Sequence, residues 1–226
     1  MKLEIGLLMI GCMAMSQYVF AQDTHIEFQN RPYDTEDYAL QTFLVAKING
    51  SIIVHGTCSA TASGDEIITP RIPATSNLQF DNVAEALGEL ARIDADILWL
   101  QDQNNIWRVY DKRVNNDIFN IRIQNLKFNH SATSGIALQV VLNAPEIKEY
   151  MKQNNYIEGL VVYPLSPIGD AGTSKLTNTL HNVTFREALD YVMKHYSGIW
   201  IYDECLDGKS TRILLRGYSY GSDKHQ

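Results

Sequence analysis

The sequence predicts an α+β fold built from two small repeated modules, each with two helices packed on a small mixed or antiparallel sheet. The main observation is an internal echo, because residues 78–87 resemble residues 180–189 after a constant shift. The shift matches Leu78, Asn82, Glu85, Ala86 and Leu87 to Leu180, Thr184, Glu187, Ala188 and Leu189. Ala39-Leu40-Gln41 also recurs as Ala137-Leu138-Gln139, so the repeat spans whole modules. A chain of 226 residues is long enough for two such domains.

Each copy of the echo is predicted to begin a helix with a capping box. The Thr184 hydroxyl can accept from a free backbone N–H, while the Glu187 carboxylate reaches back to the N–H of the cap residue. Asn82 and Glu85 have the same spacing and are predicted to do the same. Apolar residues follow each cap at three- and four-residue spacing, so each helix carries a stripe that needs an apolar partner.

The first module is predicted over residues 22–113 from local patterns. Short β-branched or alternating runs predict strands, and an apolar stripe behind acidic capping residues predicts a helix. Small polar residues predict a loop at 56–64. In chain order, we expect an edge strand at 25–28, a helix over 38–48, a strand at 51–55, extended segments over 66–72, a strand at 78–80, the capped helix 82–93, and a hairpin with strands 97–100 and 106–110.

The second module, residues 114–217, repeats this plan with longer connections. Alternation of Phe119, Ile121 and Ile123 predicts a strand over 116–128. The polar residues Thr133-Ser134-Gly135 predict a helix start, and Pro145 opens another helix. The expected elements are that strand, helices 134–142 and 146–153, a buried strand 159–163, a loop 164–174, the capped helix 184–196, hairpin strands 199–202 and 212–216, and a flexible tail 218–226.

Residues 1–21 are predicted to be a secretory signal peptide, because an apolar run follows Lys2 and Val19-Phe20-Ala21 is a small-residue cleavage site before Gln22. The run is shorter than the roughly 20 residues that a membrane span needs. A membrane anchor and a lipoprotein cleaved before Cys12 are the alternatives. The expected location is therefore periplasmic or secreted, with no membrane span.

Charge and cysteine content narrow the class of protein further. A net charge of −7 with no basic cluster argues against binding to nucleic acid. Removal of the signal leaves Cys58 and Cys205, an even number in an exported chain. The two cysteines either form one disulfide that joins the modules or remain two unpaired thiols.

The sequence shows no recognisable catalytic, metal or cofactor site, so we expect a protein that is not an enzyme. Nucleophile-elbow, metalloprotease and phosphate-loop motifs are missing. His55 and Cys58 have a spacing that zinc or copper tolerates, but they offer only two ligands. The alternative is a secreted hydrolase with a site between the modules, built from His55 with Asp102 or Asp203.

Aromatic residues gather on the two predicted hairpins. They pack against the sister module in one interpretation and form an exposed surface for a partner or glycan in the other. The unpaired hairpin edges are available for strand addition in both. The residues concerned are Trp99, Trp107, Trp200 and Tyr202.

The order of helix, strand, a Leu-x-Asn-Val-Thr-x-x-Glu-Ala-Leu segment and a hairpin resembles the short N-terminal (STN) domain of secretins and TonB-dependent transducers. Residues 180–189 carry the motif best, and residues 78–87 carry it loosely because Phe80 and Asp81 replace the Asn-Val pair. The resemblance implies a periplasmic module that recognises protein partners by strand addition or module packing, without catalysis.

We therefore expect an exported, non-catalytic protein-binding module of the bacterial cell envelope. A secretin, a TonB-type receptor or an anti-sigma factor are the partners that the resemblance implies. The alternative within the same resemblance is a structural component of a secretin or pilus-type assembly, in which the chain forms a homo-oligomer. The identity of the partner, lipid anchoring and the relative orientation of the two modules are left open by the sequence.

Overall fold

A computed structural model describes residues 25–29, 32–61, 64–72, 78–159 and 175–220. It confirms the α+β class, with five α-helices and mixed sheets in this part of the chain. The helices are α1 (Thr35–Ala46), α2 (Val83–Ile93), α3 (Ser134–Leu142), α4 (Pro145–Gln153) and α5 (Phe185–Tyr196). None of the described helices has the length and apolar character needed to cross a membrane.

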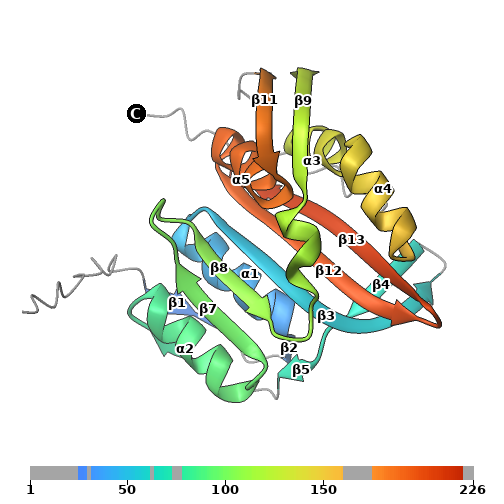
Figure 1. Ribbon diagram of the computed structural model, residues 1–226. Coiled ribbons are helices and arrows are strands. Elements are labelled where there is room, and N and C mark those ends of the chain that lie inside the picture. The colour runs from blue at the N-terminus through green and yellow to red at the C-terminus, as the bar shows by residue number, and fades with distance from the viewer. Residues whose placement is uncertain (1–24, 30–31, 62–63, 73–77, 160–174, 221–226) are drawn as a thin grey trace, which may run out of the picture.

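Seven strands form one central sheet (Figure 1). They are β10 (Tyr156–Glu158), β13 (Ser210–Ser219), β12 (Gly198–Asp207), β3 (Gly50–Thr61), β8 (Trp107–Asp111), β7 (Ile97–Gln101) and β4 (Gly64–Ile68). The order is β10-β13-β12-β3-β8-β7, and β4 pairs with the far end of β3. Strand β3 runs parallel to both β12 and β8, so strands from the two halves of the chain meet at β3 and β12.

Each half also contributes a small two-stranded sheet. In the first half, β1 (Ile26–Glu27) pairs with β6 (Gln79–Phe80), and in the second half β9 (Arg122–Ser131) pairs with β11 (Leu176–Thr184), both antiparallel. In addition, β2 (Tyr33–Asp34) pairs with β5 (Arg71–Ile72).

The two halves of the central sheet share one pattern of strand directions. In the first half, β3 is parallel to β8, and β8 is antiparallel to β7. In the second half, β10 is parallel to β13, and β13 is antiparallel to β12.

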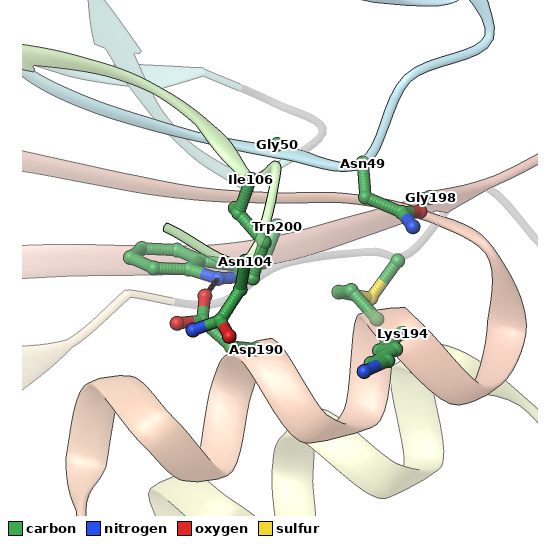
Figure 2. Close-up of a pocket in the computed structure, with 9 residues that line it drawn as sticks. Asn49, Gly50, Asn104, Ile106, Asp190, Lys194, Gly198 and Trp200 are labelled. Atoms are coloured by element: carbon green, nitrogen blue, oxygen red, sulfur yellow. Dashed lines mark hydrogen bonds between the residues drawn. The ribbon is translucent and has the colours of Figure 1, made fainter. Parts of the chain in front are cut away.

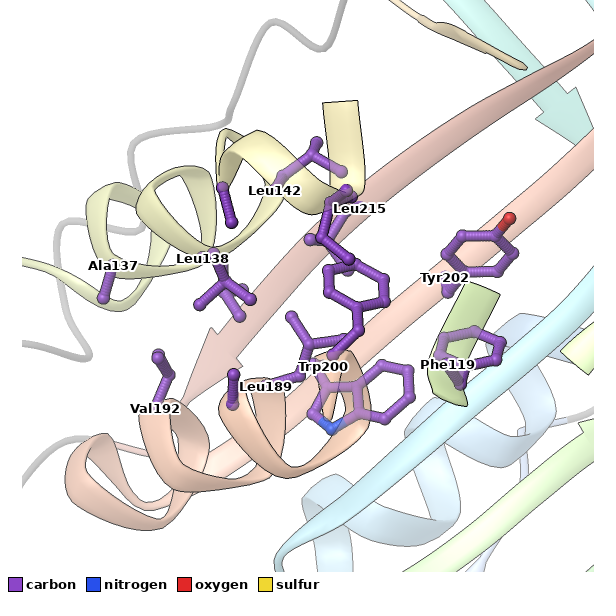
Figure 3. Packing of buried hydrophobic residues seen from close by; sticks show 14 of the residues in the cluster. Phe119, Ala137, Leu138, Leu142, Leu189, Val192, Trp200, Tyr202 and Leu215 are labelled. Atoms are coloured by element: carbon purple, nitrogen blue, oxygen red, sulfur yellow. The ribbon is translucent and has the colours of Figure 1, made fainter. Parts of the chain in front are cut away.

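Helices of the two halves cover opposite faces of the central sheet. Successive side chains of a strand point to opposite faces. Along β12, Ile199 and Ile201 are buried with the core of α1 and α2, whereas Trp200 and Tyr202 are buried with the core of α3 and α5. Figure 3 shows Trp200 beside the helix that carries Leu189, and Tyr202 next to Phe119. The sheet is thus one shared layer between two helical layers, because the hairpin strands are apolar on both faces.

The predicted helix starts are confirmed by their hydrogen bonds, with one difference between the two caps. Thr184 accepts from the N–H of Glu187, and the Glu187 carboxylate accepts from the N–H of Thr184, which completes the capping box. Asn82 accepts from the N–H of Glu85 at 2.9 Å, but the Glu85 carboxylate accepts from Asp81 instead. The second prediction was therefore wrong in its reciprocal bond, because the Glu85 carboxylate is taken by the N–H of Asp81.

Two further expectations are corrected. Residues 56–61 of the segment 56–64, expected to be a loop, continue β3, and Gly64 already belongs to β4, which pairs antiparallel with it. Small residues suit this close hairpin, since a Cβ on Gly56 would lie 2.6 Å from the Ile68 carbonyl oxygen. Residues 116–120 form a 3₁₀ turn rather than a strand, because the Asn115 side chain caps the N–H of Asp117 and Phe119 turns into the core.

Several expectations fall largely or wholly outside the described residues. The signal peptide 1–21 and the loop 164–174 lie wholly outside. Of the predicted buried strand 159–163 only Gly159 is described, and of the predicted tail 218–226 residues 221–226 are not. The tail is described as far as Tyr220, and its Ser219 still belongs to β13.

Candidate functional site

The junction between the halves is a parallel ladder reinforced by a disulfide. β12 and β3 pair from Ile199 opposite Gly50 to Cys205 opposite Gly56. Just beyond, Cys58 of β3 bonds to Cys205, with a Cα–Cα distance of 5.3 Å and 147 residues between the two cysteines. The disulfide interpretation is confirmed, and it leaves no Cys58 thiol to act with His55 as a metal ligand pair.

On the second-half face of the sheet, Arg108 of β8 reaches the helix of the other half. Its guanidinium lies 2.8 Å from the Asp190 carboxylate of α5 and 2.6 Å from that of Asp102 in the β7–β8 turn. Trp200 donates from Nε1 to Asp190 at 2.8 Å. Burial opposes ionisation of Asp102, but the backbone N–H of Ile106 and the Arg108 guanidinium outweigh it and hold its pKa below the usual range.

On the opposite face, Arg216 of β13 forms the reciprocal contact. Its guanidinium bonds both Asp203 of β12 and Glu36, which lies in the first turn of α1. Burial, and then the neighbouring Asp203, raise the pKa of Glu36 well above its ordinary value, and burial raises the pKa of Asp203 as well. Each half thus sends one arginine to a carboxylate on a helix of the other half, and these pairs fix the relative orientation of the halves.

The residues named for a hydrolase are not brought together. Asp102 and Asp203 lie in the two separate arginine clusters, while His55 lies beside Glu204, with Nδ1 3.8 Å from Glu204 Oε1. Glu204 accepts from the hydroxyl of Tyr202 at 3.1 Å and from the N–H of Asn115 at 3.4 Å. Burial raises its pKa from 4.5 to about 7.

Glu204 is one of several carboxylates near the hairpins to which the sequence assigns no role, although a signal was present. Asp203-Glu204 places two carboxylates inside an otherwise apolar strand, where a charge is retained only with partners. The Cys58 sulfur is bonded to Cys205, so it cannot serve as a nucleophile for the His55–Glu204 pair. Within the described ranges, no cluster of three or more His, Cys, Asp and Glu side chains is placed to hold a metal ion.

A small cavity lies where the starts of β3 and β12 meet α5 (Figure 2). Its volume is about 40 Å³, compared with roughly 300–1,000 Å³ for pockets that bind drug-sized ligands. It has room for water rather than for a sugar or a peptide side chain. The lining residues are Asn49, Gly50, Asn104, Ile106, Asp190, Met193, Lys194, Gly198 and Trp200.

The proposed exposed aromatic surface is wrong for three of its four residues. Trp107, Trp200 and Tyr202 are 8%, 0% and 0% exposed. Trp200 and Tyr202 pack on Phe119, beneath the helices of their own half rather than against the sister half. Trp99 is partly exposed and stacks on Trp107 at a centroid distance of 5.8 Å. These side chains are therefore mainly core residues.

An accessible apolar feature remains at the outer edge of β7. This strand ends the sheet, and among the described residues only β8 pairs with it. Ile97 and Trp99 pack with α2, so Leu98 and Leu100 point to the other face, where they are 37% and 38% exposed. Unpaired backbone groups beside exposed leucines make this edge a template for another strand.

No protein-family model matches this chain, and no curated protein or solved structure has significant similarity to it.

Proposed function

We propose that this chain is an exported, non-catalytic protein-binding module of the bacterial cell envelope, and that it recognises its partner by strand addition at β7. The observation that carries the proposal is the β7 edge with its two exposed leucines, Leu98 and Leu100. An added strand would gain backbone hydrogen bonds from the open edge and specificity from contacts with alternate side chains.

We further propose that residues 22–113 and 114–217 are two copies of one STN-like module. Three features support this: the repeated strand pairing, a side-chain cap at Asn82 and at Thr184 before the last helix of each half, and the STN-like motif around residues 180–189. In this assignment β7 and β12 are equivalent strands, as are β3 and β10.

Export of the protein has its own support. The disulfide between Cys58 and Cys205 is the kind of bond that persists in the periplasm or outside the cell and is rare in a reducing cytosol. The signal-peptide pattern of residues 1–21 agrees with the same compartment. A protein partner in the envelope, such as a secretin, a TonB-type receptor or an anti-sigma factor, would meet the β7 edge there.

Site-specific photo-crosslinking in intact cells tests this proposal. A photoreactive amino acid at position 100, on the exposed face of β7, is expected to give a discrete adduct with a partner protein. The same amino acid at Leu206, which is 67% exposed near the β12–β13 turn, provides the matched control and is expected to give none.

Leu98→Lys should abolish the adduct at position 100, because a lysine on an edge strand disfavours pairing. Equal crosslinking at positions 100 and 206, or an adduct that persists in Leu98→Lys, would contradict the assignment of the binding edge.

A further inference from the structure

The junction inside the molecule is asymmetric, and within the part of the chain that the structure describes it leaves two complementary sheet edges unpaired. The first half contributes strands in the order β3-β8-β7, and the second half in the order β10-β13-β12. The junction joins the last strand of the second half, β12, to the first strand of the first half, β3. The last strand of the first half, β7, and the first strand of the second half, β10, lie at the two ends of the sheet.

Strand directions show that the same junction can be repeated. β3 and β10 hold the same place in the strand order of their halves. β10 runs parallel to β13 and antiparallel to β12, whereas β3 runs parallel to β12. β3 and β10 therefore point in opposite directions, and one half is turned over relative to the other. This turn reverses the strands and moves the helices to the opposite face while it keeps the order of the strands. A further module added to β7 by the same operation would present its β10 strand in parallel orientation.

Apolar side chains on the two free edges correspond to buried side chains at the internal junction. On β12, Ile199 and Ile201 point away from the helices of their own half and are 0% exposed, because α1 and α2 of the other half cover them. Leu98 and Leu100 point away from the helices of their own half in the equivalent strand β7, and they are left uncovered.

The opposite edge shows the same relation. On β3, Ile53 points away from α1 and α2 and is 1% exposed within the core of the second half. On β10, Glu158 bonds Gln139 of α3 and Lys148 of α4, so the adjacent Ile157 points to the other face, where it is 46% exposed. Both ends of the sheet therefore carry an open face that the internal junction buries.

We propose that the partner of the β7 edge is a second copy of this chain, which adds its β10 strand parallel to β7 and repeats the β12–β3 junction. Because the two surfaces differ, the contact is head-to-tail and each added copy exposes a new β7 edge. The product is a linear or ring-shaped series of chains that share a continuous sheet. This inference rests on the proposed function for the β7 edge and adds the β10 edge and the identity of the partner.

Sedimentation velocity of the full exported chain over a range of concentrations tests the inference. The wild type is expected to form dimers and then larger species. Leu98→Lys with Leu100→Lys blocks one edge and Ile157→Lys blocks the other, and each is expected to weaken self-association by at least about tenfold, because a charge becomes buried at the contact. Ile136→Lys, on the exposed face of α3, is the matched control and should associate like the wild type.

Mixing the two blocked variants provides the decisive measurement. The β7-blocked chain keeps its β10 edge, and the β10-blocked chain keeps its β7 edge, so the mixture is expected to form one-to-one dimers that grow no further. Circular dichroism and a thermal midpoint close to that of the wild type identify the variants as folded.

A wild type that stays monomeric, or association that is insensitive to Ile157→Lys, overturns the inference. If Ile157→Lys has no effect while the β7 variant dissociates the assembly, the contact is a symmetric β7–β7 dimer instead. A monomeric wild type that still gives a foreign adduct at position 100 would reject self-assembly and retain the proposed function. A monomeric wild type that also gives no adduct at position 100 would reject both self-assembly and the proposed function.

Discussion

At the scale of single residues, buried charges mark the places where this protein departs from a simple apolar core. Asp203 and Glu204 lie within strand β12, Glu36 lies in the first turn of α1, and all three carboxylates are buried. Such groups are retained when they have partners, and each of these has one: a tyrosine hydroxyl for Glu204 and the Arg216 guanidinium for the other two.

Glu204 should make the stability of the protein depend on pH. Burial raises its pKa to about 7, whereas an unfolded chain leaves it near 4.5. The folded state then binds the extra proton, so this stabilising contribution is fully present below about pH 4.5 and is lost as pH rises through 7. Glu204→Gln should remove this dependence, which amounts to roughly 1–3 kcal/mol in the free energy of unfolding.

Denaturant unfolding at several pH values between 4.5 and 8 measures the effect. Glu149→Gln, on the exposed face of α4, is the control and should keep the slope of the wild type. An unchanged slope in Glu204→Gln would show that another group binds the proton.

At the scale of elements, local signals decide where helices begin. Thr184 and Asn82 each accept a hydrogen bond from the N–H three residues later, in extended backbone conformations. Pro145 begins α4 without a side-chain cap, because Ala144 at the cap position has no side-chain acceptor. Proline suits the first helical position because its fixed φ matches the helix and the N–H that it lacks would have had no partner within the helix. These patterns lie within a few residues of one another, which is why the sequence predicts them.

The complete capping box predicts a measurable cost for Thr184→Ala. The substitution leaves the N–H of Glu187 without its acceptor and should lower the free energy of unfolding by about 1 kcal/mol. Lys152→Ala, at an exposed position of α4, serves as control and should change stability by less than roughly 0.5 kcal/mol. Chemical denaturation measures both, and equal effects in the two variants would argue against the cap.

Elements that depend on distant partners were predicted less well. Residues 56–61 are small and polar, so they have no strand signal of their own, yet pairing with β4 and the disulfide makes them part of β3. Residues 116–120 continue an apparent alternation, but the cap at Asn115 and burial of Phe119 favour a turn. In the first case tertiary contacts outweigh local propensity, and in the second a local cap acts together with burial in the core.

At the scale of the whole molecule, four kinds of contact hold the halves together: the β12–β3 ladder, the packing of apolar β12 side chains under α1 and α2, the two arginine clusters and the disulfide. The disulfide closes a loop of 147 residues. Its main effect is expected on the unfolded chain, which it restricts, rather than on the geometry of the junction.

The double variant Cys58→Ser with Cys205→Ser should therefore lose about 2–5 kcal/mol of unfolding free energy and still fold. Thermal and denaturant unfolding with and without a reductant measure the loss. Reductant should destabilise the wild type and leave the double variant unchanged, which excludes a general effect of the reagent. Equal stability of wild type and variant in the absence of reductant would contradict the prediction.

The sequence by itself determined the α+β class, most helix boundaries and both hairpins, because capping residues, proline and apolar periodicity act over a few residues. The cysteine pairing was one of two open interpretations. Only the tertiary structure decided that β3 and β12 join into one sheet, that Trp200 is core rather than surface, and that Arg108 and Arg216 bond helices of the opposite halves. These contacts join residues far apart in the chain, and the choice among them depends on which apolar faces bury one another, a property of the assembled layers rather than of any segment.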